Sequence, residues 1–147
     1  MKNMKFLLSM LIIAGYSHAA NCPLMQNDGV DAEETSTVLG KTIEFCCGSC
    51  VKAFDNNTAY YIKAIPELGE IFTEKEKKQL KVCCVKLLKQ RYCPVYPDRV
   101  VNPNSPTVEY KGVKIYLWSS SAMRRWSRDP DSYYEQAVES GKLEPVK

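Results

Sequence analysis

The sequence predicts a small α+β protein in which two tandem ββα units are joined by an amphipathic helix. One observation is internal similarity: Cys22-Pro23-Leu24 recurs as Cys93-Pro94-Val95, and the segments that follow can be laid on each other. Self-similarity of this kind indicates a duplicated structural unit. The other observation is that each half contains a hairpin pattern followed by a helical pattern.

Residues 1–20 have the pattern of a secretory signal peptide. A basic start is followed by an apolar run over residues 6–16 and by small residues that place cleavage near Ala19 or Ala20. No later stretch approaches the roughly 20 apolar residues that a membrane-spanning helix needs. We therefore expect a secreted or periplasmic protein with no stable membrane insertion after the leader is removed.

Charge and histidine content exclude several classes of function. Without its leader the chain has eighteen basic and seventeen acidic residues, a formal charge of about +1, which does not indicate a nucleic-acid partner. The only histidine, His18, lies in the leader. A mature chain without imidazole lacks the usual general base of hydrolases and the ligands of mixed Cys/His zinc sites. We expect a non-enzymatic protein with no catalytic residues.

Both predicted hairpins contain a glycine-lysine turn. The first spans residues 37–45 and turns at Gly40-Lys41, and the second spans residues 108–117 and turns at Lys111-Gly112. Apolar residues alternate along the second strand of each hairpin. The alignment of the two halves matches Gly40 with Gly112, Ile43 with Ile115 and Phe45 with Leu117.

A short helix is expected after each hairpin, over Ser49–Asp55 and Ser121–Ser127. Phe54 and Tyr61 of the first half match Trp126 and Tyr133 of the second, and the two tyrosines fall in a further helical stretch. The last helix of the chain has clear boundary signals: Asp129 as N-cap, Pro130 at its first position and Gly141 as a stop.

The predicted linking helix covers residues 73–91 and begins with the capping-box pattern Thr73-x-x-Glu76. It separates a first unit over residues 21–72 from a second unit over residues 92–147. Apolar residues at spacings of three and four define its expected buried face: Leu80, Cys83, Cys84, Leu87 and Leu88.

The seven cysteines are an odd number, so at least one is free, metal-bound or joined to another molecule. Cys22 precedes the first hairpin, while Cys46, Cys47 and Cys50 stand where the hairpin runs into a helix. This layout is typical of a treble-clef-like metal knuckle, in which hairpin and helix bring thiolates to one ion. We expect the metal ligands to be Cys22, Cys50 and one of Cys46 or Cys47. A thioether from Met25 would favour Cu(I) over zinc.

The first unit matches a known domain pattern at Cys22, Gly40, Lys41, Phe45, Cys46, Cys50 and Phe54, and the second unit at Tyr110, Gly112, Tyr116, Trp126, Pro130 and Tyr133. With these residues the chain resembles the YHS/TRASH family of small treble-clef domains, in two tandem copies. The resemblance implies a metal-binding or metal-sensing role for Cys22, Cys46 and Cys50. The second copy is degenerate, because it carries Trp118, Ser119 and Ala122 in place of Cys46, Cys47 and Cys50.

The cysteines allow other interpretations. Export favours a stabilising disulfide, for instance from Cys22 to Cys46 or Cys50. Cys47-Gly48-Ser49-Cys50 also fits the Cys-x-x-Cys motif of thiol-disulfide oxidoreductases. For Cys83 and Cys84 the first expectation is a place in the core; a disulfide to Cys93, or a fourth metal ligand, are the others.

Aromatic residues are expected to form the core of the second unit, and an aromatic ligand surface is the alternative. They are Tyr110, Tyr116, Trp118, Trp126, Tyr133 and Tyr134. The function predicted from the sequence is therefore an exported metal-binding protein that holds zinc or copper. The alternatives are a disulfide- or metal-stapled interaction module, whose partner could be another exported protein, and a thiol-disulfide redox protein.

Overall fold

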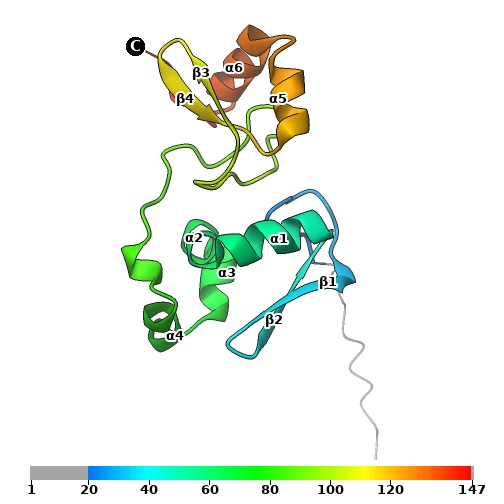
Figure 1. Cartoon of the computed structure of the whole chain (residues 1–147), viewed down its shortest axis with the longest axis vertical. Helices are drawn as coiled ribbons and strands as arrows, with labels where there is room; N and C mark the ends of the chain where they lie inside the picture. Colours follow the sequence, from blue (N-terminus) through cyan, green and yellow to red (C-terminus); the bar gives the residue numbers. More distant parts are fainter. Residues whose placement is uncertain (1–19, 147) are drawn as a thin grey trace, which may run out of the picture.

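The computed structural model describes residues 20–146 and has a mixed α+β fold with two antiparallel hairpins and six α-helices (Figure 1). The predicted signal peptide lies outside the described residues, apart from Ala20. None of the helices in residues 20–146 combines the length and apolar character that a membrane crossing requires.

The elements follow one another in the predicted order. The first unit contains β1 (Asp31–Val38), β2 (Lys41–Phe45), α1 (Gly48–Asn56), α2 (Thr58–Ala64) and α3 (Pro66–Ile71). The connection contains α4 (Glu74–Gln79) and a 3-10 turn (Val82–Cys84). The second unit contains β3 (Thr107–Tyr110), β4 (Val113–Tyr116), α5 (Ser120–Trp126) and α6 (Pro130–Glu139).

The two hairpins turn in the same way. Leu39 and Gly40 have φ of 50° and 77°, and Lys111 and Gly112 have φ of 49° and 77°. Positive φ at both central residues defines the type I′ turn, whose twist suits two-residue hairpins. The predicted match of Gly40 with Gly112 is confirmed. The predicted turn at Gly40-Lys41 is wrong by one residue, because Lys41 pairs with Val38 as the first residue of β2.

Helix packing repeats as closely as the turns do. The rings of Phe54 and Tyr61 stack with centroids 6.4 Å apart and planes at 25°, and the rings of Trp126 and Tyr133 stack at 6.4 Å and 20°. These are the two pairs that the sequence alignment matched. Since both turn and aromatic stacking recur, the duplication describes the three-dimensional structure of the chain as well as its sequence.

Each unit has its own hydrophobic core. In the first core, Phe45, Phe54 and Tyr61 are fully buried. In the second, the expected aromatic packing is confirmed: the Trp126 ring meets the Tyr110 ring edge-on at 5.5 Å. Tyr110 also lies 4.9 Å from the ring of Tyr134. Large aromatic rings thus fill the core of the second unit.

The linking helix is much shorter than predicted. Its capping box is present, with the Thr73 side chain accepting from the Glu76 backbone and Glu76 reaching back, but α4 ends at Gln79. Lys81 then adopts a left-handed conformation with φ of 55°, which stops the helix. After the 3-10 turn the chain runs to the second unit outside any helix, and extended chain covers about twice the distance per residue that a helix does.

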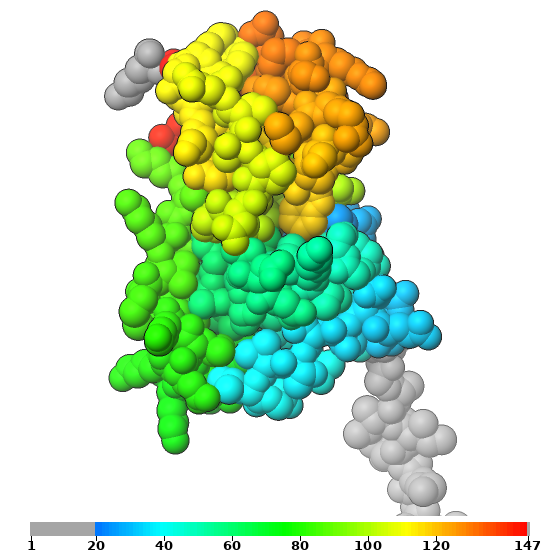
Figure 2. Space-filling model, in the orientation of Figure 1, coloured from blue at the N-terminus to red at the C-terminus, as the bar shows by residue number. Residues whose placement is uncertain are grey.

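The two units pack directly on each other (Figure 2). The buried Asn102 of the second unit donates to the Tyr61 hydroxyl of the first at 2.7 Å. The loop that follows Cys22 lies against residues 98–100: Val100 N–H donates to Leu24 at 3.0 Å, and Gln26 N–H donates to Asp98 at 3.0 Å. The first Cys-Pro loop is therefore held by backbone bonds to its own duplicate.

Candidate metal centre

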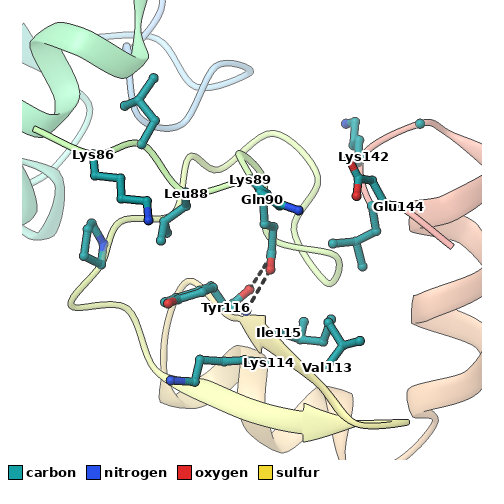
Figure 3. Close-up of a pocket in the computed structure, with 14 residues that line it drawn as sticks. Lys86, Leu88, Lys89, Gln90, Val113, Lys114, Ile115, Tyr116, Lys142 and Glu144 are labelled. Atoms are coloured by element: carbon teal, nitrogen blue, oxygen red, sulfur yellow. Dashed lines mark hydrogen bonds between the residues drawn. The ribbon is translucent and has the colours of Figure 1, made fainter. Parts of the chain in front are cut away.

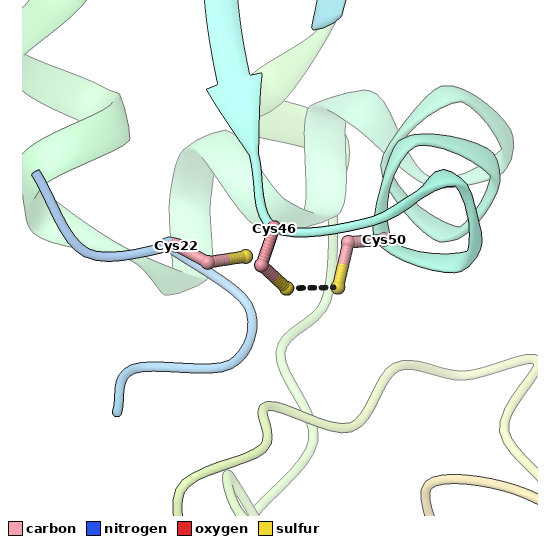
Figure 4. A group of neighbouring side chains, drawn as sticks. All are labelled: Cys22, Cys46 and Cys50. Atoms are coloured by element: carbon pink, nitrogen blue, oxygen red, sulfur yellow. Dashed lines mark hydrogen bonds between the residues drawn. The ribbon is translucent and has the colours of Figure 1, made fainter. Parts of the chain in front are cut away.

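Three separate segments bring the thiols of Cys22, Cys46 and Cys50 together (Figure 4). Cys22 lies in the loop before β1, Cys46 directly follows β2, and Cys50 lies in the first turn of α1. All three sulfurs lie within 4.8 Å of one another. Cys22 and Cys50 are buried and Cys46 is half-buried, so the cluster opens to solvent on the Cys46 side.

The sulfur separations fit a thiolate-bound metal. At a Zn–S distance of about 2.3 Å, the sulfurs at the corners of a tetrahedron lie about 3.8 Å apart. The Cys46 and Cys50 sulfurs are 3.7 Å apart. The donor set therefore needs only small side-chain adjustments to hold a soft ion.

Two further sulfurs lie beside this group. The Met25 thioether is 3.6 Å from the Cys46 sulfur, and the Cys47 sulfur is 3.8 Å from the Cys46 sulfur. Cys47 does not belong to the three-sulfur group and lies 2.9 Å from the Ser49 hydroxyl. Met25 and Cys47 are thus the two candidates for a fourth ligand.

Local backbone structure explains how the thiols are positioned. The Cys22 N–H donates to the Asp28 carbonyl at 2.8 Å, which closes the loop that carries this thiol. Cys47 is the N-cap of α1, with extended backbone, and its side chain makes no capping hydrogen bond. In the second unit Ser119 occupies the equivalent cap and accepts from Ala122 N–H. Ser119 therefore caps its helix, whereas Cys47 at the equivalent position makes no cap and places its thiol beside the cluster.

Hydrogen bonding within the cluster makes its thiols unequal. Hydrogen bonds to the Cys22 sulfur, first from the Cys50 thiol and then from backbone N–H groups such as that of Met25, lower the pKa of Cys22 to about 5. Together they outweigh burial, which alone would raise this pKa. Burial and the neighbouring Cys22 raise the pKa of Cys46 to about 12. The bond to Cys22, with burial, also raises the pKa of Cys50. An incoming ion must displace the protons of Cys46 and Cys50, so metal affinity should increase with pH.

Cys47 has a different environment. Burial would raise its pKa, but hydrogen bonds from the Ser49 hydroxyl and the Cys50 backbone N–H outweigh burial, and the pKa of Cys47 is lowered. A cysteine with a lowered pKa at a helix start is more readily deprotonated, and more reactive, than an ordinary cysteine. This property suits both a metal ligand and a redox thiol.

The duplicate site in the second unit keeps only one sulfur. Cys93, the counterpart of Cys22, is fully buried in the second core, and burial raises its pKa. Trp118 and Ala122 occupy the positions of Cys46 and Cys50. One neutral thiol among apolar groups cannot form a thiolate cluster.

The prediction that Cys83 and Cys84 are core residues is wrong. Both are exposed, because the 3-10 turn that carries them buries Val82 instead. Their sulfurs are 3.5 Å apart, and neither belongs to the three-sulfur group around Cys22. All seven cysteines carry free thiols in this structure.

Burial predicts a clear order of reactivity. In reduced, folded protein, iodoacetamide should modify Cys83 and Cys84 at least about tenfold faster than Cys93, because alkylation needs an accessible thiolate. Peptide mass mapping over a time course gives the rates, and labelling in denaturant, where all sites should react alike, is the control. Equal rates at Cys84 and Cys93 in folded protein would contradict the described packing.

Comparisons with protein-family models, with curated proteins and with solved structures found no match to this chain.

The supporting role of the second unit was not predicted from the sequence. Residues 98–100 are not part of the thiol cluster, yet their backbone groups hold the loop that carries Cys22. The available clue was the recurrence of Cys-Pro in both halves. In the structure the two Cys-Pro loops are neighbours, with Met25 paired to Arg99 in antiparallel fashion.

Proposed function

We propose that this chain is an exported, non-enzymatic protein that binds one soft transition metal, zinc or copper, through Cys22, Cys46 and Cys50. The observation that carries the proposal is the convergence of three thiols from three segments to within 4.8 Å. Three sulfurs at such spacing match the ligand chemistry of thiophilic metals. Export rests on the sequence of the leader.

The proposal includes the finer description of the fold. Each unit is taken as a treble-clef-like domain of the YHS/TRASH type, with the metal site kept in the first copy and lost in the second. The recurring turn and the recurring aromatic stack support two copies of one domain. The replacement of two thiols by Trp118 and Ala122 supports the loss of the second site.

The fourth donor decides which metal fits better. Coordination by Met25 would give a thiolate and thioether set, which favours Cu(I), whereas coordination by Cys47 would give four thiolates, which favour zinc. Substituting each residue separately, as Met25→Leu and Cys47→Ser, and comparing the affinities for the two metals identifies the donor.

Metal content tests the proposal directly. Protein purified under reducing conditions should hold about one equivalent of zinc or copper, and Cys50→Ser should lose it because only two of the three sulfurs remain. Cys83→Ser is the matched control: it removes an exposed thiol outside the cluster and should retain the metal. Elemental analysis beside a free-thiol count gives the answer. Metal-free protein whose cysteines are all oxidised except one would favour the disulfide-stapled interaction module instead.

A further inference from the structure

A groove on the second unit, away from the cysteine site, lies between the connecting segment and strand β4 (Figure 3). Its volume is about 700 Å³. The apolar part of its lining consists of Leu87, Leu88, Pro103, Val113, Ile115 and Leu143. Leu87 and Val113 are 41% and 40% exposed, and they are two of the four large apolar side chains classed as exposed in residues 20–146. Exposed apolar surface gathered in a groove is typical of a binding site.

At one end of the groove, a side chain pairs with the backbone of β4 as a neighbouring strand would. The side-chain amide of Gln90 donates to the Tyr116 carbonyl at 2.6 Å and accepts from the Tyr116 N–H at 2.8 Å. A peptide group of a neighbouring strand would make the same two bonds. Gln90 is nearly buried and is further fixed by a bond from its amide to the Tyr92 carbonyl at 2.8 Å.

Next to Tyr116, the backbone of Lys114 on the outer edge of β4 has no hydrogen-bond partner among residues 20–146. Residues along a strand direct their N–H and C=O groups alternately to either side, so Lys114 points its backbone groups to the same edge as Tyr116. Strand β3 pairs with the opposite edge of β4. In residues 20–146 no side chain or loop hydrogen-bonds the main chain of Lys114. A donor and an acceptor are therefore available beside the Gln90 amide.

The rim of the groove is positively charged. Its charged lining residues are Lys86, Lys89, Lys114, Lys142 and Glu144. None of the four lysines forms an ion pair with a carboxylate of the described residues. Lys142 is directed to the Pro97 carbonyl at 2.5 Å, which leaves the other three, all exposed, free to meet a ligand.

We propose that this groove binds an extended peptide segment with acidic and apolar side chains in alternation, which adds to β4 as a third strand in line with the Gln90 amide. Main-chain bonds to Lys114 would give register, Leu87 and Val113 would receive the apolar side chains, and the lysines would select the acidic ones. A second copy pairing through its own β4 is disfavoured, because that arrangement sets lysine against lysine.

The test uses the mature chain, isotope-labelled, and two synthetic peptides that alternate valine with glutamate or valine with lysine. Titration followed by NMR should show saturable shifts of the Lys114 and Gln90 signals with the glutamate peptide, and at least tenfold weaker binding of the lysine peptide. No saturation, equal affinity for both peptides, or shifts that depend on protein concentration without peptide would overturn the proposal.

Two variants separate the charge from the edge. Lys89→Glu with Lys114→Glu should weaken the glutamate peptide at least tenfold, whereas Lys75→Glu with Lys78→Glu, the same charge change on exposed residues of α4 outside the groove, should have no such effect. Lys114→Pro removes the free N–H on an outer edge, where proline is tolerated. It should abolish binding while the Trp126 and Tyr133 signals stay unchanged, whereas Lys114→Gln, which loses the same charge but keeps the N–H, should still bind the glutamate peptide. Retained binding in the proline variant would overturn strand addition.

Discussion

Zinc at about 100 times its dissociation constant should raise the Tm of the reduced, metal-free protein by roughly 10 °C. Binding to the folded state alone contributes about 2.7 kcal/mol at that concentration, and a small domain gains several degrees per kcal/mol. The three sulfurs converge only when β2, α1 and the loop that carries Cys22 are in place, so the unfolded chain offers no such site. Thermal scans followed by circular dichroism, with and without zinc, give the shift.

The Cys50→Ser variant is the control for this shift. It keeps the fold elements of the first unit but lacks one of the two buried cysteines of the cluster, so zinc should leave its Tm within about 2 °C of the metal-free value. If zinc stabilised Cys50→Ser as strongly as the natural chain, the stabilising ion would have to bind elsewhere.

The Phe54→Ala variant should lose about 3–5 kcal/mol of unfolding free energy, which is typical when a fully buried phenylalanine is truncated. Phe54 has no exposed surface and lies between the rings of Phe45, at 5.1 Å, and Tyr61, at 6.4 Å. Urea unfolding of the metal-free protein measures the change. A loss below about 1 kcal/mol would mean that α1 is not anchored through this ring.

Lys52→Ala provides the matched comparison on the same helix. Lys52 is exposed on α1, and substitutions at such positions usually change stability by less than about 0.5 kcal/mol. The two variants together separate the effect of the buried ring from any general effect of substitution in α1. Because α1 also carries Cys50, Phe54→Ala should weaken metal binding as well, whereas Lys52→Ala should not.

The local elements of the fold were largely predictable because their signals are local. Type I′ turns require positive φ, which glycine at 40 and 112 supplies, and Asp129 with Pro130 starts a helix wherever it is placed. The gathering of Cys22 with Cys46 and Cys50 was also predictable, since a hairpin returns the chain to the point where it began.

The connection between the units was not predictable in the same way. The pattern of Leu80, Cys83, Cys84 and Leu87 fits one face of a helix, yet Cys83, Cys84 and Leu87 are exposed. This segment connects the two cores, so its conformation depends on the distance between them. That distance depends on where the second unit packs. A helical pattern in one segment contains no information about that distance.

The loop that carries Cys22 connects the thiol cluster to the second unit. Cys22 faces the thiol cluster, while Leu24 and Gln26, a few residues on, are bonded to the second unit. In the proposed function, a metal ion bound to Cys22 would restrain this loop from one side, while the second unit restrains it from the other. Because such coupling is reciprocal, metal binding would favour the packed arrangement of the two units, and that arrangement would raise the affinity for the metal.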